Sequence, residues 1–261
     1  MPDQLDFDDN TARRFEEIYR SRDVRRRRLI ATEALAARRG DRVVDIGCGP
    51  GFHVEELAEV VGQAGHVVGV DFSEAMLDSA ARRNADRVNV EFRVGDATDL
   101  PIADMSVDGA IAVQVYEYVH DITGALAEAF RVLKPGGRIA IIDIDWSTVS
   151  WYSHDPRRME QVLSAWDEHL VHPSLPQRLA AALADAGFVD VQTRGHVFVN
   201  TDAGSDAYSG TLLPLVAEFV STHGITPDDA QAWSEDIRGL EAAGRYFFAV
   251  TKFCFSATRP E

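Results

Sequence analysis

The glycine-rich loop at residues 47–51 is the part of this chain with the clearest chemical purpose. The run Val43-Val44-Asp45-Ile46-Gly47-Cys48-Gly49-Pro50-Gly51 places glycines at alternate positions directly after an apolar strand. Glycine lets the backbone turn sharply and lets a ligand approach main-chain amides that a Cβ would block. Apolar residues then recur at helical spacing from Val54 to Val61. The pattern predicts a nucleotide-type pocket at the carboxyl end of the first strand.

Two further aspartates end the second and third apolar strands. Asp71 follows Val70, where a carboxylate can accept two hydrogen bonds from a ribose diol. Asp96, in Gly95-Asp96-Ala97, is expected beside an adenine edge. Its carboxylate can accept a hydrogen bond from the exocyclic amine of the adenine. The loop contains no lysine, and its Gly-x-Gly-x-Gly spacing differs from the Gly-x-Gly-x-x-Gly of dinucleotide sites. These features favour a ligand with a sugar and an adenine but no phosphate; the alternative is that each acid caps a helix or forms a turn.

Candidate catalytic groups follow the fourth and fifth strands, because open α/β sheets bind ligands at the carboxyl ends of their strands. His120 follows the fourth strand, whereas Asp145 and His154 follow the fifth, and these three are the candidate base or orienting groups. His169 and His172 lie further along, and a lone histidine is often only structural. The candidate acceptor pocket is aromatic and consists of Tyr19, Tyr116, Trp146, Trp151, Tyr152, Phe198 and Tyr208. The alternative is that these aromatic residues belong to an ordinary core.

The elements that must position these residues alternate between strand and helix. A helix is expected over 10–38, with Phe15, Ile18 and Tyr19 on one side, and Ser73, Asp121 and Thr226 are expected helix caps. Alternation at this spacing predicts right-handed crossovers and a mostly parallel sheet with helices on both faces. The expected strands are 42–46, 66–70, 88–94, 109–113, 138–142, 188–191 and 246–256.

We expect one domain over residues 1–261, because no linker or repeat divides the chain. Residues 1–39 are expected to form an N-terminal helical cap and residues 40–145 the cofactor-binding core. The stretches 146–175 and 197–244 are too long for idle loops and are expected to be helical lid insertions on the substrate side. A packing extension of the core is the alternative for these stretches.

Charge and composition exclude several classes of partner. The chain of 261 residues has a net charge of −16, which disfavours DNA, RNA or an anionic membrane as a partner. The basic residues at 20, 22 and 25–28 are expected to form a solvated helix face, with contact to an anionic group as the alternative. Cys48 and Cys254 offer no disulfide framework and no metal spacing, and no apolar run could span a bilayer. A cytoplasmic monomer or homodimer without a metal is therefore expected.

At this point the sequence resembles the class I S-adenosylmethionine-dependent methyltransferases. The resemblance covers residues 40 to 145 and implies a Rossmann-like α/β fold, with a seven-stranded, mostly parallel sheet whose last strand is antiparallel. Within this superfamily the chain looks most similar to ubiquinone/menaquinone-type and actinobacterial natural-product methyltransferases. Four segments carry the likeness in order: 43–51, Val70-Asp71-Phe72-Ser73, Val94-Gly95-Asp96-Ala97 and Leu133-Lys134-Pro135-Gly136-Gly137.

The resemblance also implies roles for single residues around S-adenosylmethionine and its product S-adenosylhomocysteine. Asp45 and the main chain of the loop would contact the methionine end, Asp71 the ribose, and Phe72 the adenine face. Asp96 and Ala97 would read the adenine, and Gln114 would close the methionine side. The residues implied in cofactor binding are Asp45, Gly47, Cys48, Gly49, Gly51, Asp71, Phe72, Asp96, Ala97 and Gln114.

The resemblance implies methyl transfer to an O, C or N atom of a small, aromatic or apolar acceptor by in-line displacement. The fourth strand ends in Val113-Gln114-Val115-Tyr116, unlike enzymes that methylate exocyclic base nitrogens, and the three cysteines of arsenite methyltransferases are missing. One alternative is a protein of the same fold that binds the cofactor without transferring a methyl group, redirected to cyclisation, lyase chemistry or regulation. A nicotinamide-dependent oxidoreductase is a further alternative, although its glycine spacing and catalytic pair are not evident.

Overall fold

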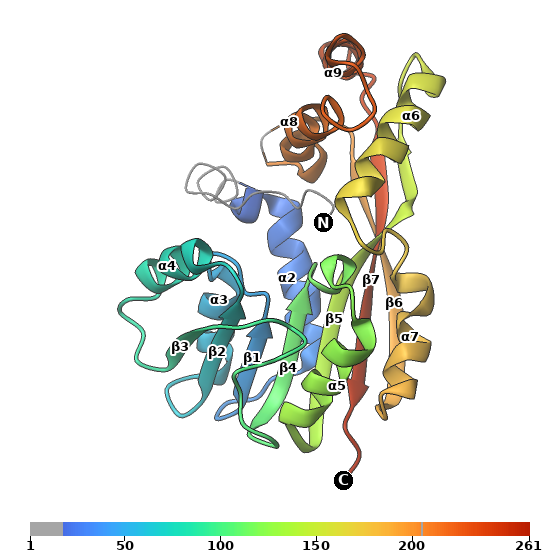
Figure 1. Cartoon of the computed structure of the whole chain (residues 1–261). Coiled ribbons are helices and arrows are strands. Elements are labelled where there is room, and N and C mark those ends of the chain that lie inside the picture. Colours follow the sequence, from blue (N-terminus) through green and yellow to red (C-terminus); the bar gives the residue numbers. More distant parts are fainter. Residues whose placement is uncertain (1–17, 205) are drawn as a thin grey trace.

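A seven-stranded sheet forms the centre of the molecule. The computed structural model describes residues 18–204 and 206–261 (Figure 1). The strands lie in the order β3-β2-β1-β4-β5-β7-β6, and β7 runs antiparallel to both of its neighbours. This arrangement confirms the predicted Rossmann-like fold. The strands are β1 (Arg42–Ile46), β2 (His66–Asp71), β3 (Val90–Val94), β4 (Val107–Val113), β5 (Leu133–Trp151), β6 (Val189–Asn200) and β7 (Phe248–Thr258).

Helices cover both faces of the sheet, because successive strand residues point to opposite sides. On one face, Val43 of β1 packs in a core with α2 (Arg22–Leu35) and α3 (Phe52–Val61). On the other face, Val44 and Ile46 pack in a core with α5 (Ile122–Val132) and α7 (Pro176–Asp185). α4 (Glu74–Arg83) packs against β2 and β3. The result is a three-layer core that holds the strand ends in place.

The strands β5 and β6 are longer than predicted, and together with β7 they extend beyond the other strands, as Figure 1 shows. Their extension carries α6 (Pro156–Trp166), η2 (Asp167–His169), α8 (Tyr208–Val220) and α9 (Pro227–Ala242). A third core joins these helices to the extended strands. The expected insertions 146–175 and 197–244 therefore begin as strand, through residues 151 and 200 respectively, and become helical only afterwards. Residues 146–151 and 197–200 are thus strand rather than helix.

The N-terminal helix is interrupted. Residues 18–20 are helical, and α2 begins at Arg22 after a break at Ser21, whose hydroxyl donates to the carbonyl of Ile18 at 2.7 Å. The single helix expected over 10–38 is thus divided, and Phe15 lies outside the described residues. α2 packs against β4, β5 and β7 of the sheet.

Three predicted helix caps are confirmed. Ser73, Asp121 and Thr226 each accept a main-chain N–H through the side chain, at the starts of α4, α5 and α9 respectively. Such a bond satisfies one of the donors left free at a helix start. Asp121 accepts from the N–H of Gly124 at 2.9 Å, which fixes where α5 leaves the end of β4. Between them lies the short helix η1 (Tyr116–Tyr118).

Candidate active site

The glycine loop forms the closed end of a cavity. The N–H groups of Gly47 and Cys48 both donate to the carbonyl of Val70, at 2.7 and 3.0 Å, so the loop is bound to the end of β2. Gly49 has φ +51°, and a Cβ there would lie 2.8 Å from the hydroxyl oxygen of Tyr19. A Cβ on Gly47 would lie 2.5 Å from Val115. The loop therefore needs glycine at both positions to keep its close packing.

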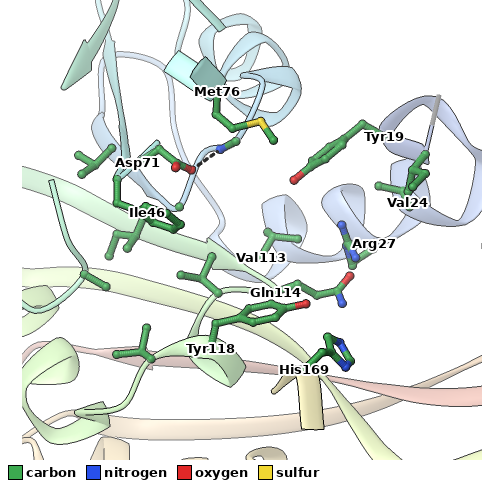
Figure 2. Close-up of a pocket in the computed structure, with 18 of the residues that line it drawn as sticks. Tyr19, Val24, Arg27, Ile46, Asp71, Met76, Val113, Gln114, Tyr118 and His169 are labelled. Atoms are coloured by element: carbon green, nitrogen blue, oxygen red, sulfur yellow. Dashed lines mark hydrogen bonds between the residues drawn. The ribbon is translucent and has the colours of Figure 1, made fainter. Parts of the chain in front are cut away.

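Asp71 connects this loop to the cavity. Its Oδ2 accepts from the N–H of Gly49 at 2.8 Å (Figure 2), and its Oδ1 accepts from the N–H of Ser73 at 3.0 Å. Burial raises the pKa of Asp71, although the main-chain donors oppose the shift. The side chain also lines the cavity. Asp71 thus both shapes the glycine loop and offers a carboxylate to a ligand beside it.

The cavity has a volume of about 570 Å³, within the range of small-molecule sites. It extends from the glycine loop to the helices carried by the strand extension. Of the predicted cofactor residues, six line it: Gly47, Gly49, Asp71, Phe72, Asp96 and Ala97, with Gln114 as a seventh at the end of β4. Asp96 holds its own turn by accepting from the N–H and hydroxyl of Thr98, at 2.8 and 2.6 Å.

Gln114 is held in a defined orientation at the middle of the cavity. It has φ +55°, which is uncommon for a residue with a side chain and favours a functional explanation. Its Nε2 donates to Oε1 of Glu117 at 3.0 Å, and Oε2 of Glu117 accepts from the indole N–H of Trp146 at 3.2 Å. Burial raises the pKa of Glu117 and, more strongly, that of the neighbouring Asp143. Because Gln114 donates toward Glu117, its amide oxygen is left as the acceptor for the cavity.

The far half of the cavity is an aromatic chamber. Tyr19, Trp146 and Tyr208 line it as predicted. Tyr118, Trp166 and His169 also line the chamber. The first two were not expected in this pocket from the sequence, and His169 had no role assigned to it. The remaining apolar wall of the chamber consists of Ile18, Val24, Leu212 and Leu215.

His169 is the buried histidine of this chamber. Its ring stacks on Trp166, with 3.8 Å between centroids and 29° between planes, and meets Trp146 edge to face at 5.5 Å. Nδ1 contacts the carbonyl oxygen of Trp166, which can only accept, so Nδ1 carries the proton. Burial lowers the pKa of His169 to about 4. The residue therefore presents an unprotonated Nε2 to the cavity at neutral pH.

Three of the predicted cofactor residues lie behind the loop. Asp45 shares a strand face with Val43 and so points toward α3, where its Oδ1 is 3.9 Å from Nδ1 of the buried His53. Cys48 packs among apolar side chains of the same layer. A Cβ on Gly51 would lie 2.7 Å from Ala80, so this glycine allows close approach of two helices. None of the three lines the cavity, so the structure does not bring them to the position expected for the ligand.

Two of the three catalytic candidates also lie outside the cavity lining. His154 has a side chain that is 59% exposed, and its Nδ1 is 2.7 Å from Asp236, away from the cavity. Asp145 is buried but occupied, since it accepts from the hydroxyl of Ser147 and the amide of Gln177. The prediction placed these residues just after a strand of five residues, whereas β5 continues past Asp145. Only His120 lines the cavity, at its exposed edge.

Four predicted pocket aromatics belong elsewhere. Tyr116 is fully buried in the core beside α5, and Phe198 is buried between Arg26 and Lys252. Trp151 packs on Trp233 and Phe248 under α9. Tyr152 is half exposed at a separate shallow recess. None of these four side chains lines the chamber.

A metal centre and a membrane-spanning helix are two other features that such a chain could contain. Within residues 18–204 and 206–261, no group of three His, Cys, Asp or Glu side chains could hold a metal ion. Over the same residues, no helix has the length and apolar character needed to cross a bilayer.

Comparisons with known proteins add independent findings. Residues 44–141 match the model of the family described as methyltransferase domain. A Streptomyces fradiae relative, described as an uncharacterized 37.1 kDa protein in transposon TN4556, is 32% identical over 241 residues, covering 86% of this chain and 64% of that protein. The 2-phytyl-1,4-naphtoquinone methyltransferase of Synechococcus elongatus is 40% identical over 141 residues, covering 52% of this chain and 59% of that protein.

Among solved structures, the Haemonchus contortus phosphoethanolamine N-methyltransferase 2 in complex with S-adenosyl-L-methionine superposes with a TM-score of 0.65. It is 17% identical and covers 99% of this chain and 59% of that one. This chain therefore spans less than two thirds of each of these three proteins. The family match coincides with the strands and loop that form the ligand end of the cavity. Residues 44–141 thus match the methyltransferase domain family, and the whole chain shares the fold of a methyltransferase crystallised with S-adenosyl-L-methionine.

Proposed function

We propose that this protein transfers a methyl group from S-adenosylmethionine to a small, largely apolar or aromatic acceptor. The observation that carries the proposal is the continuity of one cavity. Its first half is formed by the glycine loop, Asp71 and Asp96, and its second half by the aromatic chamber. A donor and an acceptor bound in the two halves would meet near Gln114.

The donor half of the cavity fits a nucleoside without phosphate. Asp71 offers a carboxylate for the ribose hydroxyls, and Asp96 with the Ala97 amide would contact the adenine. The bare main chain at Gly47 and Gly49 leaves room that a Cβ would occupy with strain. Arg27 is the single Lys or Arg among the described residues of the lining, and it stands in the other half.

When bound, S-adenosylmethionine supplies an activated methyl group on a sulfonium sulfur. The work left to the protein is then to orient the acceptor and to exclude water. The rigid walls of Trp146, Trp166 and Tyr118 suit both tasks, since all three pack within the helical extension or its edge. Correct orientation of two reactants is worth roughly 7–11 kcal/mol of barrier. We therefore assign most of the rate enhancement to this chamber.

His169 is the proposed proton acceptor of the site. Its Nε2 is unprotonated because Nδ1 donates to the Trp166 carbonyl and because burial keeps the pKa at about 4. An acceptor O–H or N–H can donate to Nε2, which orients the attacking atom and receives its proton as charge develops. His120 also lines the cavity but lies at its exposed edge, where it would contact water. His169 therefore replaces His154 and Asp145 as the candidate.

The experiment that tests the function incubates the protein with methyl-labelled S-adenosylmethionine and a panel of small phenols, quinols and amines. Label in an acceptor, with matching S-adenosylhomocysteine, is the expected result. His169→Gln should lower turnover by roughly 10²–10⁴-fold, whereas His154→Gln should not. Tight binding of the donor without label transfer to any acceptor would favour a cofactor-binding protein of redirected chemistry. A thermal shift with NAD, and none with the donor, would overturn the proposal.

A further inference from the structure

Arg27 is a buried cation without a partner in the part of the chain that the structure describes. Its side chain lines the cavity and is 6% exposed. No described carboxylate or carbonyl accepts a hydrogen bond from it, and its Nε is a buried polar atom left unpaired. The next residue provides a contrast, since Arg28 donates to both carboxylate oxygens of Glu56, at 2.9 and 2.8 Å.

The buried carboxylates around Arg27 are bound to other groups. Asp23 accepts from the amide of Asn200 at 2.7 Å and from the N–H of Tyr208 at 3.0 Å. Glu117 accepts from two side chains, as described above. A guanidinium that loses water without gaining an anion is costly to bury. The positive charge of Arg27 is therefore not neutralised by a hydrogen-bonded carboxylate of the described residues when the cavity holds no ligand.

A second buried base lies in the same region. Lys252 is fully buried, and its Nζ has no hydrogen-bond partner among the described residues. Burial first, and Arg27 next, lower the pKa of Lys252 well below its usual range. Lys252 lies 3.9 Å from the ring centroid of Tyr208, which itself lines the cavity. Arg27 Nε and Lys252 Nζ are thus two buried nitrogen atoms near this wall that have no hydrogen-bond acceptor among the described residues.

The position of Arg27 separates it from the ribose site. Figure 2 shows Arg27 across the cavity from Asp71 and beside Gln114. The surrounding lining is the aromatic chamber, with Trp146 and Leu212 among its walls. A ligand that satisfied both features would be an apolar or aromatic body that carries one anionic oxygen group.

We infer that Arg27 binds a carboxylate, or a comparable oxyanion, of a molecule held in the cavity, and that the methyl acceptor is an acidic aromatic or apolar compound. This inference rests on the proposed function. The same carboxylate chemistry is present at the methionine end of the donor, so the test must separate the two sources. A planar guanidinium is well suited to either, because it can donate two parallel hydrogen bonds to one carboxylate.

The test compares the wild type with Arg27→Met and with Arg25→Met, a matched change at an exposed position of the same helix. Calorimetry first measures the affinity of each variant for S-adenosylhomocysteine and for its decarboxylated analogue. With S-adenosylhomocysteine saturating, thermal shifts then compare benzoate, 2-naphthoate and decanoate with the corresponding neutral amides. Arg27→Lys serves as a second variant that keeps the charge and should keep a preference for the acids.

If the acceptor is acidic, the wild type should bind at least one acid more tightly than the corresponding amide. Arg27→Met should then weaken the binding of that acid by about ten- to a hundredfold and leave the affinity for S-adenosylhomocysteine unchanged. Weaker binding of S-adenosylhomocysteine, but not of its decarboxylated analogue, would keep the oxyanion site and assign it to the donor. If Arg27→Met matches Arg25→Met in every titration, the inference is overturned while the proposed function stands. If the wild type fails to bind S-adenosylhomocysteine, the proposed function itself fails.

Discussion

Gln114 and Glu117 are joined by a hydrogen bond of 3.0 Å across one turn of η1, at the point where the two halves of the cavity meet. The bond decides which end of the Gln114 amide faces the ligand. It also links the donor half to the acceptor half, because Glu117 accepts from Trp146 as well. Glu117 is fully buried and does not line the cavity, so it acts through its neighbours.

Replacing Glu117 should therefore cost stability first. Glu117→Ala leaves the amide of Gln114 and the indole N–H of Trp146 without an acceptor, at about 1–3 kcal/mol for each group. We expect urea unfolding to show a loss of roughly 2–5 kcal/mol. Glu160→Ala, at an exposed position of α6, should change the free energy of unfolding by less than about 0.5 kcal/mol. Equal effects of the two variants would contradict the assigned role.

Asp71 is expected to control donor binding. Asp71→Asn keeps the size of the side chain but loses the charge that faces the ribose position and weakens the bond to the Gly49 N–H. We expect the affinity for S-adenosylhomocysteine, measured by calorimetry, to fall at least about tenfold, because hydrogen bonds to charged groups are worth roughly 1.5–3 kcal/mol. Asp86→Asn, on the exposed surface, is the control. Unchanged affinity in Asp71→Asn would refute the ribose assignment.

The buried His169 predicts a dependence of stability on pH. Its pKa is about 4 in the folded chain and 6.5 when unfolded, so below pH 6.5 the unfolded chain takes up a proton that the folded chain refuses. Stability should fall as the pH decreases from 6.5 to 4, by about 3 kcal/mol in total from this residue, and level off below. Denaturant midpoints across this range should fall less steeply in His169→Gln than in the wild type. The exposed His154→Gln should follow the wild type, and parallel curves for all three would contradict the prediction.

Lys252 predicts a stabilising substitution. Its ammonium position is fully buried without a hydrogen-bond partner among the described residues, between the rings of Phe198 and Tyr208. Lys252→Met keeps the length of the side chain and removes a polar group whose burial costs about 1–3 kcal/mol. We expect a higher melting temperature in thermal unfolding, while Arg157→Met on the surface of α6 should have little effect. A lower melting temperature would show that Lys252 has a binding partner.

The sequence by itself determined the core of the fold and the donor half of the site. Strand patterns, helix caps and the glycine loop depend on neighbours within a few residues, and Gly47, Gly49, Asp71 and Asp96 lie where these local rules place them. One local rule was missed. Val24, Arg27, Arg28 and Ala31 share a helical face, so the spacing alone indicates that two of the basic residues are buried rather than solvated.

Only the tertiary structure decided the acceptor half. β5 and β6 extend beyond their predicted ends because each pairs with β7 and supports a separate helical core, a contact between segments far apart in the chain. That extension carries His154 to the surface and brings Trp166 and His169 over the end of β4. No spacing rule within one segment encodes such a meeting. The residues of the chamber come from five stretches of sequence, near 18–27, 118, 146, 166–169 and 208–215, and packing alone selects which of their side chains face the cavity.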